Sequence, residues 1–96
     1  MPAQMSFADF ARSATPPAGA GPALLALWHD LHGDWDRAHE LAQQDNGRNG
    51  AWVHAYLHRR EGDEGNAGYW YLRAGKPAAS GDLDAEREAI ARALLG

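Results

Sequence analysis

The chain has 96 residues, 45% of them hydrophobic, with four tryptophans, no cysteine and a formal net charge of −4. This length suffices for one domain with one core, and the absence of cysteine excludes disulfides and thiolate metal ligands. The acidic balance, in which Arg59-Arg60 is the only adjacent basic pair, disfavours nucleic acid as a partner.

The N-terminal segment MPAQMSFADFARS lacks the charged and apolar regions of a secretion signal. No stretch of the chain approaches the roughly 20 apolar residues that a membrane span needs. We therefore expect a cytoplasmic protein that does not bind membranes. Within this segment, Ser6 and Asp9 resemble a capping box, which predicts a short helix with Phe7 and Phe10 on one side.

The next segment, SATPPAGAGP, is too rich in proline and glycine for a helix and predicts a linker. Residues 1–22 are thus expected to hold a short helix and this linker, and residues 23–96 a single helical domain. In that domain Pro22 suits the start of a helix over about 23–32. Gly33 ends it, and Asp34 caps a second helix over about 35–44.

A second pair of helices is predicted after the DNGRNG segment. Asn49 is expected to cap a third helix over roughly 51–60, and the Gly62-Asp63 turn to start a fourth that runs to about 74. A last helix begins near Asp82. Because no segment alternates with a period of two residues, the fold class is predicted to be all-α.

The two helical hairpins resemble each other at a fixed offset. Aligning ALWHDLHGDWDRAHELA with AYLHRREGDEGNAGYWY pairs His29 with His58 and Gly33-Asp34 with Gly62-Asp63. An internal repeat of this kind is typical of helical-hairpin arrays. Two hairpins leave apolar surfaces open, and the last helix, the N-terminal segment or self-association is expected to cover them.

The second hairpin resembles a tetratricopeptide or Sel1-like repeat. The matching positions are Gly62-Asp63, Ala67, Tyr71, Ala74 and Pro77. The strings HAYLHR and YWY-RAG also resemble an uncharacterised bacterial family, which implies no function. The repeat resemblance implies two antiparallel hairpins in a tetratricopeptide-like arrangement, with a concave face that binds peptides or other partners.

Carried over to this chain, the concave face includes Asp30 together with Trp52, Tyr56 and Arg59. A rotation of 100° per residue independently places the last three on one side of their helix. Among the consecutive aromatics of YWY, Tyr71 is expected in the core. That placement leaves Tyr69 or Trp70 to meet the last helix, a partner or solvent.

The leading hypothesis is therefore a non-enzymatic interaction or self-association module without a cofactor. It is expected to bind a protein partner or to form a homodimer. The expected binding residues are Asp30, Trp52, Tyr56, Arg59 and Trp70. A small-ligand site between aromatic walls such as Trp35 and Trp52 is a third hypothesis, although a tryptophan near a helix start more commonly fills the core.

The second hypothesis is a metal-binding protein or a metal-dependent hydrolase that uses His54 and His58. These residues lie about 40° apart on a helix, close enough to share one divalent ion. Candidates for a third ligand are His29, His32, His39 and Glu61. Ala55 follows His54, so the general base of the HExxH proteases is absent. The favoured interpretation is that both histidines pack within the hairpin, as His29 does in the first copy, so the sequence assigns no metal ligand.

Overall fold

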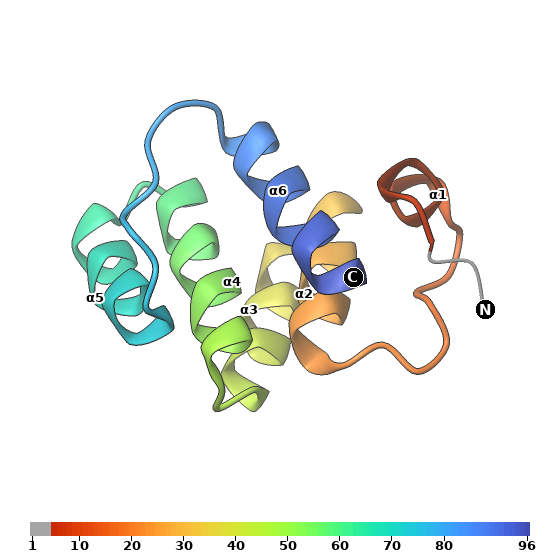
Figure 1. Ribbon diagram of the computed structural model, residues 1–96, viewed down its shortest axis with the longest axis horizontal. Helices are drawn as coiled ribbons and strands as arrows, with labels where there is room; N and C mark the ends of the chain where they lie inside the picture. The colour runs from red at the N-terminus through yellow and green to blue at the C-terminus, as the bar shows by residue number, and fades with distance from the viewer. Residues whose placement is uncertain (1–4) are drawn as a thin grey trace.

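The computed structural model describes residues 5–96, and in that range every regular element is an α-helix (Figure 1). The helices are α1 (Phe7–Arg12), α2 (Pro22–Leu31), α3 (Trp35–Gln44), α4 (Arg48–Arg60), α5 (Glu64–Ala74) and α6 (Leu83–Leu95). The predicted all-α class is confirmed. None of these helices is long and apolar enough to cross a membrane.

The helix starts follow the capping residues of the sequence. The side chains of Ser6, Asp34, Asp63 and Asp82 each accept a hydrogen bond from the backbone N–H three residues later. The two hairpin turns depend on Gly33 and Gly62, whose φ angles of 84° and 88° favour glycine. Short-range chemistry therefore sets most of the helix boundaries.

The predicted start of the third helix was wrong. Helix α4 begins at Arg48 with Gly47 as its N-cap, instead of near residue 51 with Asn49 as the cap. The reason lies in the preceding turn, where Asp45 Oδ1 accepts the Gly47 N–H at 2.8 Å and turns the chain earlier. Gly50 then passes so close to this turn that an added Cβ would lie 2.2 Å from the Asp45 carbonyl oxygen.

The helices pack in chain order and are then covered by the chain ends. Helix α2 packs on α3, α3 on α4, and α4 on α5, while α6 lies across α2 and α4 (Figure 1). Helix α1 contacts α2 and α6, and its Phe10 is fully buried in the main core. The last helix and the Phe7/Phe10 segment thus cover the apolar surface that two hairpins leave open.

The contact between α4 and α5 has a small core of its own. Ala55 and Ala67 are buried there, and Tyr71 packs against them. Two alanines at a crossing allow the helix axes to approach closely, which brings the larger side chains beside them into contact. The predicted core position of Tyr71 is confirmed.

Candidate functional site

Helix α6 covers the side of α4 that carries the expected binding residues. Tyr56 is fully buried, and its hydroxyl donates a hydrogen bond of 2.5 Å to Asp30 Oδ2, which is also buried. Arg87 of α6 reaches the same carboxylate oxygen through Nη1 at 3.0 Å. Burial and the bond to Asp30 raise the pKa of Tyr56. In this structure Asp30 and Tyr56 therefore join α2 and α4 to α6.

Arg59 is also engaged within the chain. Its Nη1 donates to Glu86 Oε1 at 2.7 Å, and both side chains are only 9% exposed. The hydroxyl of Tyr71 donates to the other oxygen of Glu86. The sequence held a sign of this pairing, since the acidic first turn of the last helix supplies partners for the basic end of α4.

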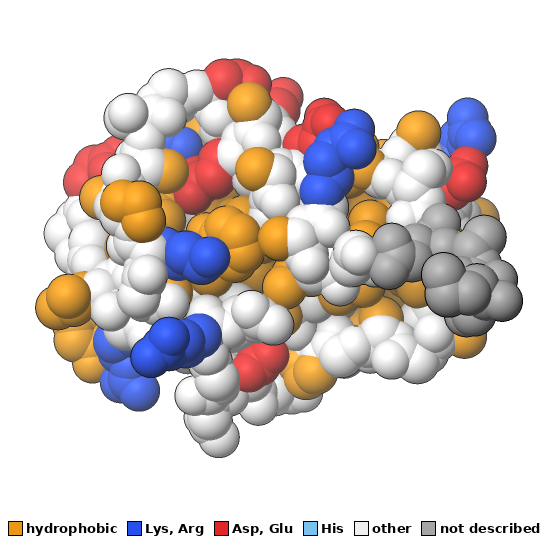
Figure 2. Space-filling view, viewed as in Figure 1, with side chains coloured by type: hydrophobic (Ala, Val, Ile, Leu, Met, Phe, Trp, Pro, Cys, Tyr) orange, Lys and Arg blue, Asp and Glu red, His pale blue; other side chains and the backbone are white. Residues whose placement is uncertain are grey.

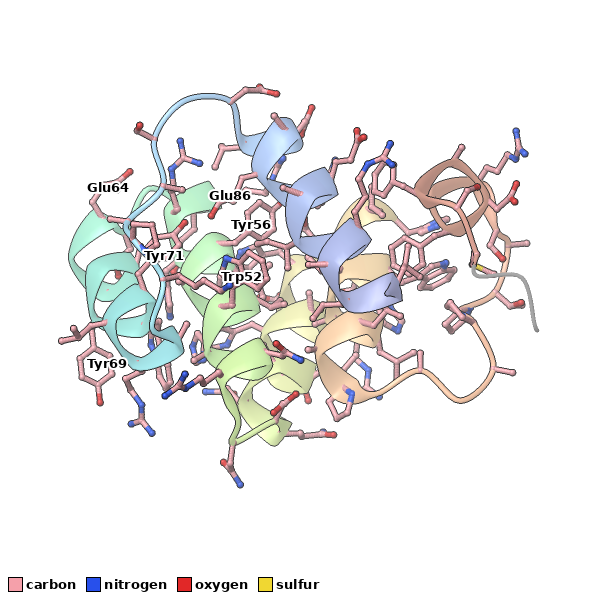
Figure 3. All side chains as sticks on the ribbon, in the orientation of Figure 1. Trp52, Tyr56, Glu64, Tyr69, Tyr71 and Glu86 are labelled. Carbon is pink, nitrogen blue, oxygen red and sulfur yellow. The ribbon has the colours of Figure 1, made fainter. Side chains whose placement is uncertain are left out.

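Trp52 lies at the edge of this covered face. Hydrophobic side chains are visible between α6 and the segment leading to it (Figure 2). A cavity of about 220 Å³ is lined in part by Trp52, Tyr71, Pro77 and Ile90. Lys76 Nζ lies 4.2 Å from the centre of the Trp52 ring. Figure 3 shows Trp52 and Tyr56 on the same side of α4, towards Glu86.

The structure does not bring all five expected binding residues together. Trp70 lies on the opposite side of α4, where its ring stacks on His54 with centroids 3.9 Å apart and planes at 13°. The binding role of Asp30, Trp52, Tyr56, Arg59 and Trp70 stays a prediction. In this structure Asp30, Tyr56 and Arg59 make polar contacts within the chain, Trp52 lies at the edge of the same face, and Trp70 stacks on a histidine.

That stack belongs to a cluster of three histidines between α3 and α4. His39 of α3 and His54 and His58 of α4 each offer a ring nitrogen, and these nitrogens lie within 4.8 Å of one another. Nε2 of His39 lies 2.9 Å from Nε2 of His54. Two facing nitrogens at this distance need a proton or a metal ion between them, because two lone pairs repel.

Aromatic rings hold the histidine cluster from both sides. The Trp35 ring stacks on His39 at 4.9 Å with planes at 9°, and the Trp35 indole N–H donates to the Leu57 carbonyl oxygen at 2.9 Å. Trp70 covers His54 from α5. Trp35 and His39 are four residues apart, so helical spacing could have indicated their stack, whereas no local spacing links Trp70 to His54.

Glu61 orients the third histidine. Its Oε2 lies 2.7 Å from Nδ1 of His58, so Nε2 is the nitrogen of this ring that Glu61 does not engage. A carboxylate on the outer nitrogen of a histidine fixes its tautomer and makes the inner nitrogen a better ligand. Glu61 also lies with His58 and Asp63 in a second group of potential ligand atoms within 4.8 Å of one another.

The remaining two candidates lie elsewhere. His29 and His32 contact Trp28, the first edge-on and the second stacked at 4.1 Å. Within residues 5–96, neither belongs to a group of potential ligands that could hold a metal ion. Of the four candidates for a third ligand, His39 is the one whose nitrogen joins those of His54 and His58.

Burial keeps two members of the cluster, His39 and His54, uncharged near neutral pH. The pKa of His54 is lowered to about 4, first by burial and then by the neighbouring His39 and His58. The pKa of His39 is lowered as well, by burial and by His58. Neutral imidazole is the form that binds metal ions.

The metal-free protein is expected to lose stability as the pH falls from about 6.5 towards 4. The lowered pKa means that His54 takes up a proton in the unfolded chain at a pH where the folded chain excludes it, so acid favours unfolding. We expect a loss of up to about 3 kcal/mol in the free energy of unfolding, measured by urea denaturation at a series of pH values. A His54→Gln variant should give a flatter profile over this range, and an equally steep profile in that variant would refute the prediction.

A cavity of about 410 Å³ opens beside the cluster. His54 and Trp70 form part of its wall, and the α3–α4 turn and the end of α5 form the rest. One member of the histidine cluster, His54, therefore borders a space large enough for a small molecule.

Comparison with protein families, curated proteins and solved structures found no match for this chain. Its function is therefore inferred from the geometry of its own residues.

Proposed function

We propose that this protein binds a divalent transition-metal ion through His39, His54 and His58. The observation that carries the proposal is the convergence of three ring nitrogens from two helices within 4.8 Å of one another. Tetrahedral zinc with bonds of 2.0 to 2.1 Å places its ligand nitrogens about 3.3 Å apart. The Nε2 atoms of His39 and His54 are 2.9 Å apart, close to this value, and a ring nitrogen of His58 lies within 4.8 Å of both histidines' nitrogens.

The surroundings of the histidines suit a metal ion in three ways. Burial holds the imidazoles of His39 and His54 neutral, and two tryptophan rings restrict the motion of the same two side chains. Glu61 supplies a hydrogen bond to Nδ1 of His58. Imidazole ligands favour zinc, copper or nickel over calcium or magnesium. Zinc is the appropriate first probe.

The number of protein ligands has a chemical consequence. Three histidines leave a fourth position of a tetrahedral ion for water or a substrate, as in catalytic zinc sites, whereas structural sites use four protein ligands. The cavity beside His54 provides space on that side. The arrangement supports reversible binding of a further ligand to the metal.

A direct test is titration of the metal-free protein with Zn²⁺ in an isothermal calorimeter at pH 7.5. One equivalent should bind, and the affinity should fall below a pH of about 6 because protons compete for the histidines. The melting temperature should rise with Zn²⁺ and return after a chelator is added. Binding of less than a tenth of an equivalent, without a change in melting temperature, would exclude the site.

A second candidate function is self-association through the outer side of α5. Leu72 is 80% exposed and Tyr69 51% exposed, and α5 forms one end of the helix stack (Figure 1). An exposed apolar and aromatic pair at an uncovered end is typical of an interface. A second copy is the natural partner, because two identical ends can pair about a twofold axis.

For this dimer we expect Leu72→Glu to give a monomer in sedimentation equilibrium at concentrations where the unmodified protein is dimeric. The added charge would have to be buried without a partner. Ala93→Glu, an exposed position on α6, is the matched control and should leave the dimer unchanged. A monomeric unmodified protein across the concentration range would rule out this second function.

A further inference from the structure

The cavity beside the histidine cluster is lined by unpaired positive charge. Arg48, at the start of α4, and Arg73, in the last turn of α5, both contribute to its wall together with His54 and Trp70. Lys and Arg side chains are seen to gather at this end of the molecule at the lower left of Figure 2. The cavity therefore combines a buried histidine with two guanidinium groups.

These two arginines differ from the other arginines of the chain. Within residues 5–96, neither Arg48 nor Arg73 has a carboxylate oxygen within 4.0 Å. Every other arginine has such a partner, namely Arg12, Arg37, Arg59, Arg60, Arg87 and Arg92. Although the chain has more acidic than basic residues, the guanidinium groups of Arg48 and Arg73 form no ion pair among the described residues, and both line the same cavity.

The two guanidinium groups are held near the cavity by other contacts. Arg73 Nη1 donates to the Tyr69 hydroxyl at 3.1 Å, and its guanidinium carbon lies 5.2 Å from the centre of the Trp70 ring. The Arg48 guanidinium lies beside Gly75, the C-cap residue of α5. A Cβ atom added to Gly75 would be 3.8 Å from Nη1 of Arg48. Both groups therefore approach the same end of α5.

The other charged residue of the cavity is Asp45, and its position limits its effect. Its Oδ1 accepts the backbone N–H of Gly47 at 2.8 Å, within the turn between α3 and α4. Gly47, the N-cap of α4, provides no side-chain oxygen for the free N–H groups of the first turn. The positive end of the helix dipole thus adds to the two arginines.

We propose that this cavity binds a small oxyanion, a phosphate or carboxylate group, between Arg48 and Arg73 and next to the metal held by His54. Guanidinium groups bind phosphate and carboxylate through paired N–H donors, and a divalent ion with an open position accepts an oxygen of the same group. The metal contact rests on the proposed function, whereas the arginine contacts do not depend on it.

The test measures binding of inorganic phosphate and of acetate to the full chain by isothermal calorimetry, with and without one equivalent of Zn²⁺. We expect saturable 1:1 phosphate binding to the zinc-loaded protein, and about tenfold weaker binding in Arg48→Gln and in Arg73→Gln. Arg37→Gln, which changes an exposed arginine of α3, is the control for net charge and should bind as the unmodified chain does. The ratio of phosphate to acetate affinity distinguishes the two kinds of oxyanion.

The outcomes separate this inference from the metal proposal. Zinc binding without binding of either anion would overturn the anion site and leave the metal site intact. Absence of zinc binding would overturn the metal site, and phosphate binding to the metal-free chain that depends on Arg48 and Arg73 would still support the anion site. Equal weakening in Arg37→Gln would show a general charge effect and overturn the anion site.

Discussion

Replacing His39 with alanine is expected to raise the dissociation constant of the Zn²⁺ complex by at least about 100-fold. Loss of an outer partner of a metal ligand already costs 10- to 100-fold, and here a ligand itself is removed. His39 supplies the nitrogen from α3, 2.9 Å from that of His54. It is half-buried, so its removal should disturb the fold less than removal of His54. Competition with a chromophoric chelator measures the constant.

His32→Ala is the matched control for this variant. His32 is also a histidine stacked on a tryptophan, Trp28, but in residues 5–96 it belongs to no group of potential metal ligands. Its replacement should leave zinc affinity within about twofold, the range expected of a surface change. Equal losses of affinity in the two variants would mean that zinc binds to surface histidines in general. Unchanged affinity in His39→Ala would remove His39 from the site.

Asp30→Ala is expected to lower the free energy of unfolding by about 3 to 5 kcal/mol, the cost of leaving buried charge without its partner. The Asp30 side chain is 4% exposed, and it accepts from Tyr56 at 2.5 Å and from Arg87 at 3.0 Å. Removal of the carboxylate leaves the Tyr56 hydroxyl and Nη1 of Arg87 without this buried acceptor. Urea denaturation followed by circular dichroism measures the change.

Asp84→Ala tests the reason for that loss. Asp84 also pairs with Arg87, at 3.2 Å, and with Arg60, but its side chain is 69% exposed. Surface ion pairs contribute about 0 to 1 kcal/mol, so this change should be small. If both aspartate variants lost the same small amount, burial of the Asp30 network would not be what holds α6 in place.

The contacts that hold α6 on α4 involve residues that were expected to bind a protein partner. The expected binding residues Tyr56 and Arg59 contact Arg60, Asp30 and Glu86 within the chain. A protein partner at this face would have to displace α6 and replace those contacts. The outer side of α5 is exposed without such a displacement, which makes it the more accessible surface for a second copy.

Those features of the fold that depend on residues close together in the sequence could be predicted. Capping by Asp34, Asp63 and Asp82, and turns at Gly33 and Gly62, involve residues at most a few positions apart, and the structure confirms them. The start of α4 was misplaced because the Asp45 side chain, which accepts the Gly47 N–H, turns the chain before the predicted cap Asn49.

The candidate site could be read only in part. The spacing of His54 and His58 was visible because one turn of helix brings residues four apart onto one side. The choice of His39 among the possible third ligands depended on how α3 packs on α4, across a separation of 15 residues. The placement of Arg48 and Arg73 around one cavity was not foreseen, because it arises from the packing of α4 on α5.

The sequence by itself determined the all-α class, most helix boundaries and the histidine pair on α4, since periodicity and capping act over one helical turn. Only the tertiary structure decided which sides of the helices are covered by other helices and which are exposed. Helix α6 covers the side of Tyr56 through contacts such as Arg87 to Asp30, 57 residues apart, and α5 brings Trp70 onto His54 on the other side. Such contacts depend on the burial of whole helix faces, which no local pattern specifies.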